Sequence, residues 1–166
     1  MFRRLRETGP VALVPAAWGV VIATYIGAVT DHALFVAHVV MTVLLAGFAA
    51  TGYADMREGL LRVWWRVIAV GVVPAAAGVV GFAADIDALL AVALYGWMGL
   101  PAVGLYYTGR RVPDGRVVYL AGTALCLVGA VAFATAPVIA NGVAVGGLVA
   151  VGLGQTAGIA DTVARF

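Results

Sequence analysis

Long stretches without a single charged side chain constrain the fold of this chain more than any other feature. The longest, Val117–Ala160, has 44 residues and would be about 66 Å long as one helix. The hydrocarbon core of a bilayer is about 30 Å thick, and about 20 apolar helical residues cross it. The stretch is therefore expected to form two membrane-spanning helices, with a turn at Thr135–Pro137 because proline opens a helix well.

Four more stretches have the length of one membrane span: Thr8–Thr30, His32–Ala54, Val67–Ala84 and Ala88–Gly109. Continuous apolar runs favour helices over the alternating strands of a membrane barrel. With 64% hydrophobic and 11% charged residues, the chain is predicted to be an all-α, integral membrane six-helix transmembrane bundle in one domain, residues 1–166. The expected helices lie near residues 10–30, 33–54, 64–84, 88–109, 117–136 and 138–160.

Charged residues are divided unevenly between the two sides that six spans create. The ten basic residues are all arginines, and all lie on the side of the N-terminus: Arg3, Arg4, Arg6, Arg57, Arg62, Arg66, Arg110, Arg111, Arg116 and Arg165. The other side has only Asp31, Asp85, Asp87 and His32. Because basic residues are retained in the cytoplasm during insertion, both termini are expected to be cytoplasmic and the chain to lie in the cell membrane. The basic charge then reflects topology and contact with lipid headgroups, not nucleic-acid binding.

Repeated and glycine-rich segments bear on how the helices pack. VPAAWGVV (Val14–Val21) recurs as VPAAAGVV (Val73–Val80), which supports the hypothesis of three helical hairpins descended from one. The helix at 138–160 is rich in glycine, and small residues let helix backbones approach closely in lipid. Tight packing within the chain and a homo-oligomer interface through this helix are both consistent with that pattern.

The two histidines of the chain, His32 and His38, are the strongest candidates for chemistry. Six residues apart on a helix, they differ by about 120° in direction and 9 Å in height, so they cannot clasp one metal ion. His32 is expected to be a solvated residue at the outer helix end. His38 lies inside the span, on one face with Asp31 and Thr42, and a buried ionisable group in a membrane span is a candidate functional site. The alternative is a neutral imidazole that bonds to a neighbouring helix.

Other polar side chains are expected at the depth of His38: Tyr25, Tyr95 and Asn141, with Thr42 on the histidine's own helix. Together they predict an outward-facing polar pocket that binds a cofactor or small ligand, with one ring nitrogen of His38 held by a hydroxyl or backbone carbonyl. The most specific form of this prediction is that haem b binds to His38, the one side chain assigned to the metal. A Soret band would identify the haem. Thr51, Tyr106, Tyr107, Thr108, Gln155 and Thr156 are predicted to be residues of the inner membrane interface.

Other classes of function are kept as alternatives. The sequence has no recognisable nucleophile–base constellation and no lysine to hold retinal, so it gives no positive sign of an enzyme or a retinal pigment. A channel or transporter for an ion or small solute, and a structural subunit of a membrane complex, are the two alternatives to ligand binding.

Cysteine labelling tests the topology. Cysteines placed at Asp31, Asp85 or Asn141 should react with a membrane-impermeant reagent from outside, and those at Arg57 or Arg111 only from the cytoplasm, because all arginines lie on one side of six spans. Labelling of position 111 from outside would contradict this orientation.

Overall fold

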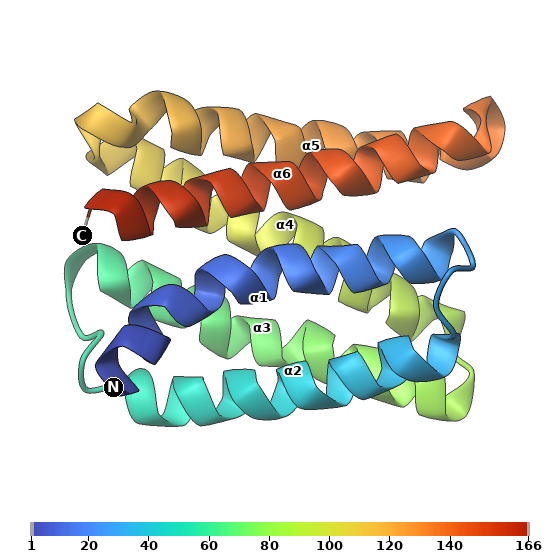
Figure 1. Ribbon diagram of the computed structural model, residues 1–166, viewed down its shortest axis with the longest axis horizontal. Helices are drawn as coiled ribbons and strands as arrows, with labels where there is room; N and C mark the ends of the chain where they lie inside the picture. Colours follow the sequence, from blue (N-terminus) through green and yellow to red (C-terminus); the bar gives the residue numbers. More distant parts are fainter. Residues whose placement is uncertain (1, 166) are drawn as a thin grey trace.

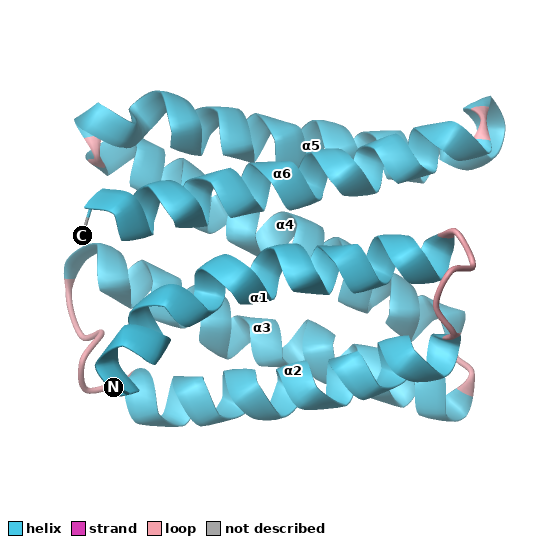
Figure 2. Cartoon of the chain, viewed as in Figure 1, coloured by secondary structure: helices cyan, strands magenta, loops and turns pink. Residues whose placement is uncertain are grey.

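The chain forms six long helices. They run side by side along one axis and are joined by short connections at the two ends of the bundle (Figures 1 and 2). The computed structural model describes the backbone of residues 2–165 and the side chains of residues 12–140 and 142–164. This part of the chain contains no strand, which confirms the all-α prediction. The helices are α1 (Phe2–Tyr25), α2 (Asp31–Gly52), α3 (Gly59–Ala84), α4 (Asp87–Arg111), α5 (Arg116–Ile139) and α6 (Asn141–Arg165), with a single 3₁₀ turn, η1 (Pro113–Gly115), before α5.

The helices have the length and composition of membrane spans. Five helical segments are long and apolar enough to cross a bilayer: Asp31–Gly52, Gly59–Ala84, Asp87–Arg111, Pro113–Ile139 and Gly142–Ala164. In α1, the part whose side chains are described, Ala12–Tyr25, is also apolar but shorter. α1 runs along the bundle beside the other helices (Figure 1). The protein is therefore a multi-pass helical membrane protein.

The two ends of the bundle differ in charge. Both termini lie at one end, where the α2–α3 and α4–α5 connections also lie (Figure 1). That end takes the ten arginines and five carboxylates, Glu7, Asp55, Glu58, Asp114 and Asp161, which leaves a formal charge of +5. Three carboxylates at the opposite end, Asp31, Asp85 and Asp87, give −3, and the two ends together give the net +2 of the chain. We call these the arginine end and the acidic end.

Two connections at the acidic end differ from the sequence prediction. α1 ends at Tyr25, five residues early, because Gly27 takes a positive φ of 75° and Thr30 caps α2 by accepting from the Ala33 amide. The α5–α6 turn lies at Ala140 instead of Thr135–Pro137. Pro137 stays inside α5, and Ala140 alone, in an extended conformation, reverses the chain. Membrane helices tolerate such a proline better than soluble helices do.

Helix packing follows a curved path through the bundle. From α2 to α6, each helix packs on the one that follows it in the chain. α1 packs on α6 and makes only slight contact with α2. The hairpins α3–α4 and α5–α6 are thus well packed, whereas α1–α2 is not. The repeated segments also lie in different surroundings, since Pro15 in α1 is exposed and Pro74 in α3 is buried. The structure therefore gives the triplication hypothesis no support beyond the sequence match.

The closest helix pair, α5 and α6, is in contact through glycines. Gly122 lies opposite Gly154, and Gly129 lies opposite Gly147, so the two pairs are in the same antiparallel register. A Cβ atom on Gly129 would lie 2.5 Å from the Gly147 carbonyl oxygen, and one on Gly147 the same distance from the Gly129 carbonyl oxygen. Such spacing is possible only without side chains, and it allows extensive van der Waals contact between the backbones. These two α6 glycines therefore pack against α5 of the same chain.

The buried core lies among α1, α4, α5 and α6. Its members are Trp18, Met98, Ala102, Leu105, Tyr119, Cys126, Leu148 and Val151. α2 contributes none of them, and Gly52 is its one buried residue. The helix that contains both histidines is thus peripheral, and it is held mainly by α3.

Adding one methyl group to the α5–α6 contact should destabilise the protein. Gly129→Ala would force the helices apart or distort them, at a cost of about 1–3 kcal/mol, which is typical of overpacking. Gly146→Ala is the matched control in α6, because nothing lies within 4 Å of a Cβ at that position. Thermal unfolding in the same detergent measures both, and equal melting temperatures of the two variants would contradict the close contact.

Candidate functional site

The His38 imidazole is fixed by its own helix. Its Nδ1 is 2.9 Å from the Leu34 carbonyl oxygen, one turn earlier. A carbonyl can only accept, so Nδ1 carries the hydrogen and, in the neutral ring, the lone pair is on Nε2. A backbone carbonyl of this kind is one of the two partners that the sequence predicted for the ring. Thr42, another predicted site residue, donates to the His38 carbonyl oxygen at 2.7 Å and so also bonds within α2.

The free edge of the imidazole fits into α3. A Cβ added to Gly78 would collide with Cδ2 and Nε2 of His38, so the absence of a side chain there makes room for the ring. The Phe82 ring, one turn further along α3, packs edge-on against the imidazole with 5.5 Å between ring centroids. His38 therefore lies in the α2–α3 contact, where its Nε2 edge is turned to a helix backbone.

A shallow pocket lies directly above this contact, at the acidic end. Phe82 separates it from His38, and the Phe35 ring lies edge-on to Phe82 with 6.5 Å between centroids. The His32 ring in turn lies 6.2 Å from the Phe35 ring. The pocket has a volume of about 290 Å³ and is lined by Asp31, His32, Phe35, Phe82 and Ala83. We call it the α2–α3 pocket.

The two predicted tyrosines lie together, but on the other side of the bundle. Tyr25 of α1 and Tyr95 of α4 both pack edge-on against Phe133 of α5, with centroid distances of 5.6 and 6.1 Å. They therefore share an aromatic cluster with each other, whereas the aromatic contact of His38 is with Phe82.

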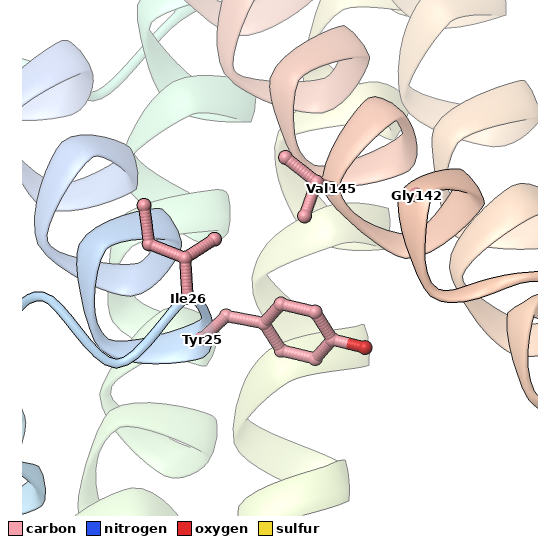
Figure 3. Close-up of a pocket in the computed structure, with 4 residues that line it drawn as sticks. All are labelled: Tyr25, Ile26, Gly142 and Val145. Atoms are coloured by element: carbon pink, nitrogen blue, oxygen red, sulfur yellow. The ribbon is translucent and has the colours of Figure 1, made fainter.

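Tyr25 also borders a second pocket, of about 360 Å³, between the end of α1 and the start of α6. Figure 3 shows Tyr25 and Ile26 on one side of it and Val145 and Gly142 on the other. The last predicted residue, Asn141, begins α6, but its side chain lies outside the described residues.

Sequence reasoning missed a buried polar side chain that joins three helices. Gln155 was predicted to be an interface residue, yet it is only 3% exposed. Its Oε1 accepts from Trp18 Nε1 of α1 at 3.0 Å, and its Nε2 donates to the Trp97 carbonyl oxygen of α4 at 2.8 Å. The prediction failed because α6 was expected to end near residue 160. It continues to Arg165, so Gln155 lies ten residues, or about 15 Å, from the helix end.

Other interhelical hydrogen bonds lie closer to the arginine end. Trp64 Nε1 of α3 donates to Thr108 Oγ1 of α4 at 3.1 Å, and Trp65 Nε1 donates to the Ala49 carbonyl oxygen of α2 at 2.8 Å. Thr108 is buried among the helices, three residues before the end of α4 at Arg111, so its predicted place at the level of the inner interface stays a prediction. These bonds satisfy indole and hydroxyl groups inside an apolar environment, where an unpaired polar group would be costly. Their role is structural.

The described part of the chain has no group of three or more His, Cys, Asp or Glu side chains placed to hold a metal ion. Comparison of the chain with protein-family models, with curated proteins and with solved structures gave no match. The function must therefore be argued from the geometry of the site alone.

A methyl group at Gly78 should displace His38. In Gly78→Ala the new Cβ would overlap the imidazole, so α2 must move away from α3, and we expect a loss of about 1–3 kcal/mol in stability. Gly47→Ala in α2 is the control, since nothing lies within 4 Å of its Cβ. Thermal unfolding of the two variants in one detergent measures the difference. Unchanged stability of Gly78→Ala would show that the histidine does not occupy this notch.

Proposed function

We propose that this multi-pass membrane protein binds a small ligand at its acidic end, in the α2–α3 pocket above His38. The observation that supports it is the grouping of a carboxylate, Asp31, with the Phe35 and Phe82 rings around one cavity. The pocket volume of about 290 Å³ is near the lower limit of about 300 Å³ for ligand pockets, which favours a small molecule. With the arginine end in the cytoplasm, as the charge distribution favours, the pocket opens to the outside.

The chemistry of the pocket favours a small organic cation. All three carboxylates of the acidic end are unopposed by any arginine or lysine there, so a cation gains electrostatic energy on approach. Aromatic ring faces add cation–π attraction and suit quaternary ammonium groups especially. His38 has a supporting role in this proposal, because it packs beneath Phe82 and holds that ring at the floor of the pocket.

Haem b, the sharpest sequence hypothesis, gains less support from this geometry. A haem iron on His38 would have to approach Nε2, which is turned to the α3 backbone at Gly78. Its two propionates would lie near a membrane end that carries three carboxylates and no arginine. On the proposal made here, the purified protein shows no Soret band, and a Soret band lost in His38→Ala would decide for haem instead.

A second candidate, a structural subunit of a membrane complex, is favoured by one observation. Gly52 is the only buried residue of α2, and Val40, Val43 and Leu44 are exposed. Such a face is covered by lipid or by another membrane helix. Native mass spectrometry from lipid discs would distinguish a face covered by lipid from one covered by another membrane helix. It would also test the hypothesis of a homo-oligomer. The channel or transporter alternative stays a prediction.

Tetraethylammonium is a suitable probe for the proposed pocket. We expect saturable binding by isothermal titration calorimetry, weakened about tenfold in Asp31→Asn, which removes a charge next to the bound cation. Asp87→Asn is the matched control, because it removes the same charge from the same end but does not line the pocket. His38→Ala should weaken binding more than His32→Ala, since only His38 supports Phe82. Equal effects of Asp31→Asn and Asp87→Asn would contradict the site.

A further inference from the structure

The guanidinium group of Arg62 lies over two aromatic rings at the arginine end. Its Cζ is 4.8 Å from the Tyr53 ring centroid and 4.5 Å from that of Trp65. The two rings are themselves edge-to-face at 5.2 Å, and Trp65 is anchored to the α2 backbone through its indole N–H. The cation is thus held in a fixed position between the end of α2 and the start of α3.

One donor of this guanidinium, Nη1, is buried and has no hydrogen-bond partner among the described residues. An arginine has five N–H donors in a planar fork that matches phosphate, and burial of one without a partner is costly. An anionic group bound to the other guanidinium nitrogens would neutralise the charge and so offset part of that cost.

A second cation points to the same place. Arg57, in the α2–α3 connection, lies with Cζ 5.7 Å from the same Tyr53 ring. Two guanidinium groups on one ring repel each other, and an anion shared between them would turn this repulsion into attraction. The start of α3 adds backbone amides that its N-cap side chain does not satisfy, because Glu58 makes no side-chain cap hydrogen bond.

The surroundings of this cluster are those of a lipid headgroup. It lies where two membrane-spanning helices, α2 and α3, reach the arginine end of the bundle. Leu61, next to Arg62 in sequence, is 56% exposed, and Val70 and Val73 of α3 are also exposed. Acyl chains beside these side chains would place a lipid phosphate at the level of the arginines.

We infer that Arg62 and Arg57, positioned by Tyr53 and Trp65, form a binding site for the phosphate of an anionic phospholipid. The inference rests on the membrane-spanning helices and is independent of the α2–α3 pocket at the opposite end.

Lipid discs of defined composition test this site. Native mass spectrometry of the full chain from mixed phosphatidylglycerol and phosphatidylcholine discs should show phosphatidylglycerol retained in preference. Arg62→Gln should reduce that affinity about tenfold, because a charge-assisted, bidentate contact is lost. Arg111→Gln is the matched control: Arg111 also stacks on an aromatic ring, Tyr107, at the same end of the bundle, and has the same charge.

Fold and charge effects are separated by two further measurements. Arg62→Lys keeps the cation over the rings but lacks the planar fork, so it should melt like the native protein in phosphatidylcholine discs and still bind phosphatidylglycerol several-fold less tightly. Equal loss in Arg62→Gln and Arg111→Gln, or no loss in Arg62→Gln, would overturn the site. If inorganic phosphate in phosphatidylcholine discs stabilised the native protein as much as phosphatidylglycerol does, the bound phosphate would not have to come from a lipid, and the lipid assignment would be overturned.

Discussion

Direct contact between the backbones of α5 and α6 is the constraint on which the rest of the bundle depends. In lipid the hydrophobic effect does not drive helices together, so close van der Waals contact must do so. Gly122 and Gly129 of α5 meet Gly154 and Gly147 of α6 at a spacing that no side chain would permit. This pair forms the wall against which α1 and α4 pack, with the core residues Leu105 and Val151 between them.

Polar contacts then fix how the other helices sit on that pair. Gln155 of α6 holds the Trp18 indole of α1 with its oxygen and the α4 backbone with its nitrogen, so three helices meet at one satisfied amide. In an apolar environment each of these groups would be costly if unpaired, which makes the arrangement specific as well as stable. α2 has a weaker attachment, through the Trp65 bond to Ala49 and the insertion of His38 at Gly78. A rigid core of four helices thus carries α3 and, through it, a peripheral α2.

The sequence was sufficient for the helical class, the membrane spans and the gathering of arginines at one end, since these follow from run lengths and charge placement alone. It was insufficient where a few residues decide a boundary. Proline's preference for helix starts placed a turn at Pro137, although a proline inside a membrane helix is tolerated and Ala140 makes the turn. The pattern of apolar residues also cannot show which face of a helix meets which neighbouring helix. Tyr25 and Tyr95 were expected near His38, yet both pack on Phe133 of α5, because α1 packs mainly on α6 and α4 packs on α5.

The uneven packing of the bundle bears on where function can reside. Residues of the α1, α4, α5 and α6 core are held by several neighbours each, so a ligand there would have to displace satisfied contacts. α2 has a single main neighbour, and both candidate sites lie along that one contact: the α2–α3 pocket at the acidic end and the Arg62 cluster at the arginine end. Binding at either end would need only a small adjustment of α2 against α3, because segments with few buried contacts cost least to move. A bound lipid at one end and a ligand at the other would then act on the same helix pair, which is the physical condition for coupling between them.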